Sequence, residues 1–188
     1  FKTKQDQIIA LVKSKLTSTE LEWINEKMAV VSELETSSKF NVCFSLVSRF
    51  IANEIVIWKN KETDKFESIY PGFRKSEWNK QDLTRALLMI ALDVSVNKSI
   101  LSPFFQIAEM NEQVALYKGL YFLKNASKFQ DQFAEGIRTN MANVFDAIAT
   151  GNPFAKAYLE EEEWNQLILK SFFMDRKIYF AYNPNSFH

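Results

Sequence analysis

The side chains of this sequence that could bind or transform a small molecule are amides and guanidinium groups close to apolar helical stripes. Asn140 falls inside the apolar stripe of a helix predicted over residues 126–150, and Arg138 flanks that stripe. Asn165 falls inside the stripe of a helix predicted over residues 160–174. These positions predict polar groups that face an apolar interior.

Two interpretations of Asn140 and Asn165 stay open. A buried amide without a partner costs about 1–3 kcal/mol, so each must be paired. In the structural interpretation they hydrogen-bond loop carbonyls and lock one helix packing. In the functional interpretation they form, with Arg138, the polar end of a ligand pocket walled by Phe and Leu.

The arginines Arg85 and Arg138 also have two interpretations. Each can form an ion pair, and Glu54, Asp82 and Glu135 are the candidate partners. Alternatively, a guanidinium in an apolar setting can anchor an anionic or carboxylate ligand.

The sequence excludes several classes of enzyme. His188 is the only histidine and Cys43 the only cysteine, so neither a histidine-activated nucleophile nor a Cys/His zinc site can be built. The Glu-x-x-His motif of di-iron bundles and the glycine-rich phosphate loops are missing. We therefore expect no metal and no cofactor, and only an acid/base enzyme that uses carboxylates or tyrosines remains possible.

The composition favours a single all-α domain over residues 1–188. The chain is 47% hydrophobic with 17 Phe, which provides a thick aromatic core, and its 4 Gly and 4 Pro are too few for a many-stranded protein. Lys plus Arg equals Asp plus Glu at 23 each, so no overall field attracts nucleic acid. No membrane-spanning run or signal peptide is evident, and a lone buried Cys43 suits a reducing compartment, so we expect a cytoplasmic protein.

About seven or eight helices are predicted from apolar periodicity and capping signals. Their ranges are 5–16, 17–34, 40–59, a central apolar run after Asn79, 103–110, 114–123, 126–150 and 160–174. The second helix has two possible capping boxes, Thr17 with Glu20 or Thr19 with Glu22. Asn79 and Asn111 are predicted caps, and Gly151 ends the long helix.

Short links between successive helices predict antiparallel pairs that form an irregular, HEAT-like stack or a compact bundle. Residues 60–77 are predicted to be a long irregular connection that packs down or serves as a lid. The segment 177–188 is predicted to be a short strand or an irregular strap.

Five segments of the sequence together resemble one protein family. They read WNKQDLTRALL (78–88), ALYKGL (115–120), AEGIRTNM (134–141), NPF (152–154) and WNQLILK (164–170). These segments resemble the EboA family, and the motifs are concentrated in residues 78–175. The matching positions are Asp82, Arg85, Tyr117, Glu135, Arg138, Thr139, Asn140, Asn152, Trp164, Asn165, Gln166 and Lys170.

The resemblance implies a cytoplasmic, non-membrane protein encoded in a bacterial gene cluster that makes or exports a secondary metabolite. It implies no defined catalytic activity. The leading hypothesis is therefore a non-catalytic accessory or carrier protein, with other proteins of the cluster or a small metabolite as partners. The alternative is an enzyme or binding protein with a pocket around Arg138, Asn140 and Asn165.

Overall fold

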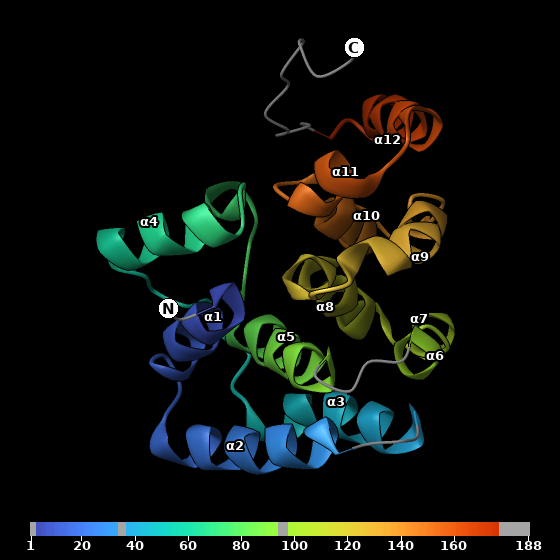
Figure 1. The fold of residues 1–188 in the computed structure, drawn as a ribbon. Coiled ribbons are helices and arrows are strands. Elements are labelled where there is room, and N and C mark those ends of the chain that lie inside the picture. The colour runs from blue at the N-terminus through green and yellow to red at the C-terminus, as the bar shows by residue number, and fades with distance from the viewer. Residues whose placement is uncertain (1–2, 34–36, 94–97, 177–188) are drawn as a thin grey trace.

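The computed structural model describes residues 3–33, 37–93 and 98–176. The strand or strap predicted over residues 177–188 lies outside these ranges, as does Leu34, the last apolar position of the second predicted helix. Figure 1 shows the arrangement of the helices in space.

The described residues are helical and contain no strand; an isolated bridge joins Ile55 and Asn79. The helices are α1 (Lys4–Lys13), α2 (Ser18–Ser32), α3 (Ser37–Phe50), α4 (Asn60–Ile69), α5 (Lys80–Asp93), α6 (Lys98–Leu101), α7 (Phe104–Ile107), α8 (Met110–Gly119), α9 (Gln130–Gly136), α10 (Ala142–Ala149), α11 (Pro153–Tyr158) and α12 (Glu161–Phe173). Three 3-10 turns complete them: η1 (Phe73–Lys75), η2 (Leu120–Phe122) and η3 (Ala126–Phe129). The all-α prediction is confirmed, with more helices than the seven or eight expected.

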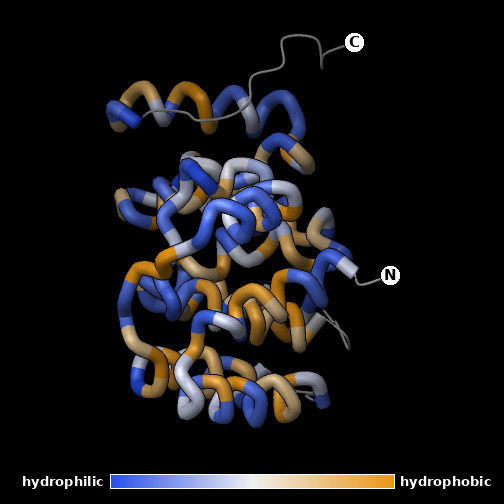
Figure 2. Tube along the Cα trace, turned by 90° about the vertical axis from the view of Figure 1, so that its left-hand side faces the viewer, coloured by the Kyte–Doolittle hydropathy of each residue, from blue (hydrophilic) through white to orange (hydrophobic). Residues whose placement is uncertain are grey.

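The helices form a stack whose centre is α5. Helices α2 and α3 pack on one side of α5, α8 packs on the other, and α10 packs on the far side of α8 (Figure 1). All side chains from Lys80 to Leu92 are buried, as the nearly all-round apolar sequence of this helix predicts. Apolar segments alternate with polar ones along the tube, and the last helix, α12, lies at one end of the stack (Figures 1 and 2).

Two predicted helix starts are confirmed, and one is wrong. Helix α2 uses the first of its two possible capping boxes, because Thr17 accepts from the backbone of Glu20 and the Glu20 carboxylate accepts from the backbone of Thr17. The Asn79 side chain accepts from the backbone N–H of Asp82 at 2.7 Å and so begins α5. Asn111 is not a cap, because α8 already begins at Met110.

The connection predicted over residues 60–77 contains a helix. Eight of the ten residues of α4 are polar, so its sequence offers few apolar positions from which a helix could be predicted. Phe66 and Ile69 nevertheless place one apolar side chain per turn on the core, and Phe66 stacks on Phe73 with 3.9 Å between ring centroids. The connection therefore packs down on the core.

Two long predicted helices are divided. The helix predicted over residues 40–59 ends at Phe50, so Glu54 is exposed rather than part of a helical stripe. The helix predicted over 126–150 is broken after α9, where Arg138 and Thr139 donate their backbone N–H groups to carbonyls three residues back. Such bonds tighten and end a helix, and α10 starts only at Ala142, after the turn.

Two glycines allow distant parts of the chain to touch. Gly72 (φ 103°) and Gly151 (φ 63°) are both in the left-handed region. A Cβ on Gly151 would lie 2.4 Å from the carbonyl oxygen of Gly72, and one on Gly72 would lie 2.7 Å from the carbonyl oxygen of Gly151. Only glycine permits both the backbone conformation and the approach. Gly151 also ends α10, as predicted.

None of the described helices is long and apolar enough to span a bilayer.

Candidate functional site

An enclosed ion pair joins α5 to α8. Lys118 Nζ donates to Asp82 Oδ2 at 2.7 Å, and the exposed fractions of the two side chains are 9% and 5%. The same ammonium group donates to the backbone carbonyl of Glu77 and lies 5.2 Å from the ring centroid of Trp78. A charged pair so removed from water is stable only with these additional partners.

The ion pair lies at the wall of a groove of about 700 Å³, which we call the polar groove. The 75–79 segment and the start of α5 form one side, and α8 and α10 form the other. Asn79, Asn111 and Asn143 reach the groove from three different elements. The volume lies within the range of ~300–1,000 Å³ that is typical of small-molecule sites.

A second charged pair lies in the polar groove. Arg176 Nε and Asp146 Oδ1 are 2.8 Å apart, and the two side chains are 36% and 40% exposed. Both atoms are enclosed, yet neither makes a hydrogen bond of acceptable geometry with any described residue. These two atoms face each other, so the pair adds one positive and one negative charge to the wall of the groove.

Four predicted site residues meet in a smaller hollow of about 210 Å³. Tyr117 reaches it from α8, while Glu135, Arg138 and Thr139 reach it from the end of α9. A Cβ on Gly136 would lie 2.5 Å from the Tyr117 ring, so this glycine lets α9 approach α8 closely. Two of the segments that carried the family resemblance therefore pack directly on each other.

The groups of this hollow are already engaged with one another. Arg138 forms an exposed ion pair with Glu135 at 2.8 Å, which confirms that candidate pair. Burial, and secondarily Glu135, raises the pKa of Tyr117 to about 12. The Tyr117 hydroxyl is therefore neutral at physiological pH and donates a long hydrogen bond of 3.5 Å to the carbonyl of Gln132.

Among the described residues Arg85 makes no direct ion pair with Glu54, Asp82 or Glu135, although the charge of Asp82 acts on it from nearby. Its side chain is only 3% exposed, its Nε donates to the carbonyl of Phe44 at 3.3 Å, and its guanidinium lies 5.5 Å from the Phe44 ring centroid. Burial lowers its pKa, and the nearby Glu112 opposes that effect. Nη1 is buried without a hydrogen-bond partner among the described residues. Glu54, a predicted partner, instead pairs with Lys80.

Asn152 takes the structural role that was considered for Asn140 and Asn165. Its amide donates to the carbonyls of Tyr117 at 3.1 Å and Ala147 at 2.8 Å, and its oxygen accepts from the backbone of Phe154 at 3.0 Å. The side chain is 1% exposed, so these bonds tie α8, α10 and α11 together. Lys170 similarly ties α12 to the α9–α10 turn, by donating to the carbonyl of Thr139 at 2.5 Å.

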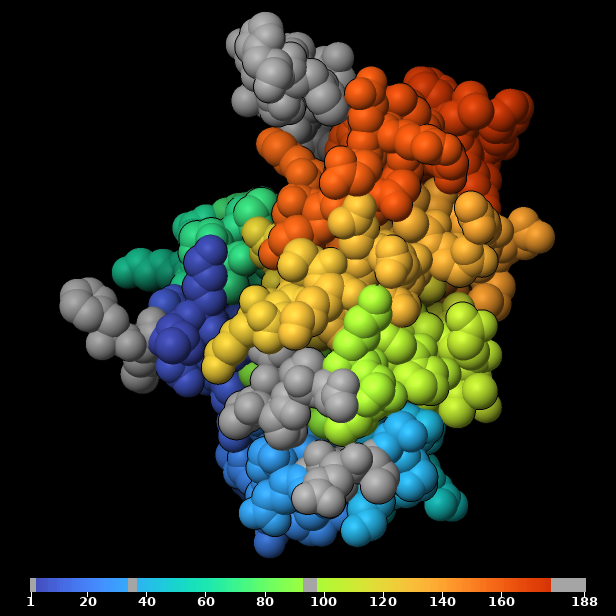
Figure 3. All heavy atoms as spheres, turned by 45° about the vertical axis from the view of Figure 1, so that its right-hand side comes forward, coloured from blue at the N-terminus to red at the C-terminus, as the bar shows by residue number. Residues whose placement is uncertain are grey.

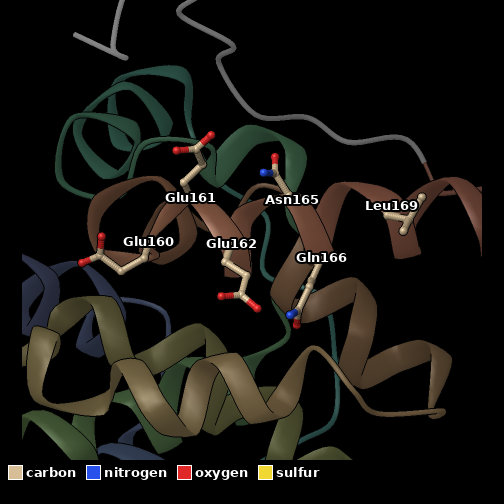
Figure 4. A pocket seen from close by; sticks show the side chains of 6 residues that line it. All are labelled: Glu160, Glu161, Glu162, Asn165, Gln166 and Leu169. Atoms are coloured by element: carbon tan, nitrogen blue, oxygen red, sulfur yellow. The ribbon is translucent and has the colours of Figure 1, made fainter.

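The predicted burial of Asn140 and Asn165 is wrong. Asn140 is exposed because the helix that would have buried it is broken at that point. Asn165 is exposed with Gln166 on α12, where both line a shallow depression beside three glutamates (Figure 4). Helix α12 buries the face that carries Leu167 and Ser171, with Trp164 half-buried nearby.

The predicted pocket around Arg138, Asn140 and Asn165 is therefore not assembled: Arg138 and Asn165 line different hollows. The polar groove, which was not predicted, contains Asp82 from the candidate set together with Lys118, Asn111 and Asn143. One signal could have pointed to it, because a lone lysine within the apolar run VALYKGLYFL requires a buried partner.

The structure thus defines an all-helical protein with ligand-sized hollows between its central helices. The family described as metabolite traffic protein EboA matches residues 4–185, so the chain belongs to the EboA family. The match extends well beyond residues 78–175, where the recognisable motifs are concentrated, and includes the N-terminal helices. No curated protein and no solved structure matches the chain significantly.

Proposed function

We propose that this protein is a non-catalytic carrier that binds a small polar metabolite in the polar groove. It acts in the cytoplasm as an accessory to the biosynthesis or export of a secondary metabolite, encoded with its partners in one bacterial gene cluster. The description of the family as a metabolite traffic protein supports the carrier role.

The observation that carries the proposal is the chemistry of the groove wall. Charged pairs and side-chain amides from α5, α8 and α10 converge there around about 700 Å³ of space. The amides of Asn111 and Asn143 are exposed to this space and present both donors and acceptors. A polar metabolite would satisfy these donors and acceptors.

The charged groups Lys118 and Asp82 are already bound to each other, which favours a binding role over a catalytic one. The Lys118 ammonium is held by the Asp82 carboxylate and by a backbone carbonyl. A general acid or base must exchange a proton with the substrate within hydrogen-bond reach, and a pair held in this way is a poor candidate. An enzymatic role remains the alternative, and turnover of a bound compound would establish it.

The proposal can be tested by thermal unfolding in the presence of fractionated extract from the protein's own cells. A ligand at about 100 times its dissociation constant adds about 2.7 kcal/mol, which raises the unfolding temperature by about 5–11 °C for a chain of this size. We expect one or more fractions to produce such a shift. A flat response across extract that contains the cluster's metabolites would contradict the carrier role.

Two double variants locate the binding site. Asn111→Leu with Asn143→Leu removes two amides from the polar groove, whereas Asn140→Leu with Asn165→Leu removes two exposed amides outside it. We expect the first variant to lose the shift and the second to keep it. The opposite result would place the binding site at Asn140 and Asn165, as the sequence suggested.

A second candidate function is contact with a partner protein from the same gene cluster, and α12 carries the observation that favours it. Leu169, Phe172 and Phe173 at its C-terminal end are 58%, 75% and 82% exposed, and Glu161 and Glu162 lie at the other end. Such a face suits a partner segment with basic residues followed by apolar ones. Cross-linking in cells, with the wild type compared with the double variant Phe172→Ser/Phe173→Ser, would test this function. We expect the variant to capture less of the partner protein, and equal capture by the two proteins would contradict the contact.

A further inference from the structure

A second hollow, separate from the polar groove, has walls of a different chemistry. It encloses about 400 Å³ between the start of α1, the end of α4, the segment after η2 and the end of α11. Its walls are Ile69, Tyr121, Phe122, Leu123 and Tyr158, and we call it the aromatic cleft. Figure 3 shows the blue N-terminal residues lying against the yellow segment near residue 120.

The walls of the aromatic cleft are held in place by the surrounding core. Gln5 Nε2 donates to the carbonyl of Phe122 at 2.9 Å, which fixes the start of α1 across the cleft. The Phe122 ring packs on Tyr70 and Trp78, with ring centroids 5.1 and 5.9 Å apart. Tyr121 lies 6.4 Å from Tyr158 by ring centroid, so two phenol rings border the same space. The cleft is therefore preformed rather than a gap between loose chains.

The charged side chains among the residues that line the cleft are two lysines. Lys4 and Lys124 are exposed at its rim, and the described residues that line it include no acidic side chain. The whole sequence has a formal net charge of zero, so this concentration of positive charge is local. Positive charge at the mouth of an apolar cleft favours a ligand whose apolar body carries an anionic group.

An unpaired hydroxyl lies behind the cleft wall. Tyr70 is fully buried, its ring is perpendicular to that of Tyr121 at 5.6 Å, and its hydroxyl has no hydrogen-bond partner among the described residues. Burial raises the pKa of both Tyr70 and Tyr121, so both hydroxyls remain neutral and can donate. Of these two residues, Tyr121 lines the cleft, so its phenol is the one that a bound molecule can contact.

We infer that the aromatic cleft is a second binding site, which takes a one- or two-ring apolar compound that carries a carboxylate, sulfonate or phosphate group. The rings lie against Tyr121, Phe122 and Tyr158, and the anion lies at the rim between Lys4 and Lys124. This site is independent of the proposed ligand of the polar groove, because its described lining residues and those of the groove do not overlap.

The inference can be tested with 1-anilinonaphthalene-8-sulfonate, a two-ring anionic probe whose fluorescence rises in apolar sites. We expect a saturable rise that fits one site per chain. N-phenyl-1-naphthylamine has the same rings without the sulfonate and should bind at least tenfold more weakly. Equal binding of the two probes would overturn the requirement for an anion.

Matched variants show whether the fluorescent probe binds in the aromatic cleft. Lys4→Glu with Lys124→Glu should weaken binding of the anionic probe at least tenfold, whereas Lys13→Glu with Lys128→Glu changes the net charge equally and should leave it within twofold. Tyr158→Leu should weaken both probes. Because apolar probes also bind exposed patches, Phe172→Ser with Phe173→Ser is the remaining control.

Three further results would overturn the inference: no saturable binding by the wild type, loss of binding in the α12 variant, or equal losses in the two lysine variants. Asn111→Leu with Asn143→Leu should leave probe binding unchanged, since it alters only the polar groove. The absence of binding in the aromatic cleft and the absence of binding in the polar groove can therefore be measured separately.

Discussion

Asp82 and Lys118 are 36 residues apart in sequence, yet their charged atoms lie 2.7 Å apart between α5 and α8. The pair forms part of the wall of the polar groove and fixes the two central helices relative to each other. Any ligand of the groove therefore meets a surface whose charge and geometry are set before binding, which lowers the entropic cost of association.

Removing the ammonium of Lys118 is expected to destabilise the fold. Lys118→Met leaves the buried carboxylate of Asp82 unpaired, a change that costs about 3–5 kcal/mol. Urea denaturation followed by circular dichroism measures the loss. The control is Lys98→Met, since Lys98 pairs with Asp131 at 3.5 Å on the surface and should matter by less than about 1 kcal/mol. Equal effects of the two substitutions would show that the Asp82–Lys118 pair has no structural role.

Replacing the amide of Asn152 should lower the free energy of unfolding much more than replacing the amide of Asn140. Asn152→Leu leaves buried backbone carbonyls and an N–H group without their partner, at about 1–3 kcal/mol for each group. Asn140→Leu changes an exposed side chain and should stay within about 0.5 kcal/mol. Thermal unfolding of both variants measures the two losses of stability. A destabilised Asn140→Leu with an unaffected Asn152→Leu would contradict the placement of the two residues.

The contact between Gly72 and Gly151 should tolerate no side chain. Gly151→Ala places a Cβ 2.4 Å from a backbone oxygen at a positive φ, so the chain must shift, and we expect a loss of more than about 1 kcal/mol. In Gly119→Ala the closest atom is instead the flexible sulfur of Met89, so that loss should be smaller. Chemical denaturation gives the ranking, and a reversed order would refute the close backbone approach.

Glu20 should make the stability depend on pH in the acid range. Burial raises the pKa of this carboxyl, but hydrogen bonds from the backbone of Ala52 and Thr17 and from Lys80 outweigh burial and lower the pKa overall. A lowered folded-state pKa stabilises the fold above the unfolded value of about 4.3, and this stabilisation is lost as the pH falls through the folded value.

The variant Glu20→Gln tests that expectation. It should be less stable than the wild type at pH 7 by about 1–3 kcal/mol, because Lys80 loses one of its two acidic partners. The difference should shrink as the pH falls below the unfolded-state pKa of about 4.3 and through the lowered folded-state pKa. A difference that is constant from pH 7 to pH 3 would show that the Glu20 charge has no role. The measurement is urea denaturation at several pH values.

The sequence could predict the elements that combine apolar periodicity with a local signal. The central helix after Asn79, the capping box of Thr17 and Glu20 and the end of α10 at Gly151 all depend on neighbouring residues and are confirmed. Helix α4 was missed because its sequence is mostly polar, and its burial depends on tertiary contacts of Phe66.

The candidate site could be predicted only in part, because it depends on pairings between distant segments. The resemblance identified Asp82, but its partner Lys118 becomes apparent only when α5 and α8 are packed together. Asn165 and Leu169 share one side of their helix, but α12 presents that side to solvent. A helical wheel gives the relative positions of side chains but not which face meets the core.

The most direct test of the central claim is equilibrium dialysis of the purified protein against extract of its own cells, with mass spectrometry of both compartments. We expect one compound to be enriched with the wild type and with Asn140→Leu/Asn165→Leu, but not with Asn111→Leu/Asn143→Leu. Enrichment that survives loss of the groove amides, or no enrichment at all, would contradict a carrier that binds its metabolite in the polar groove.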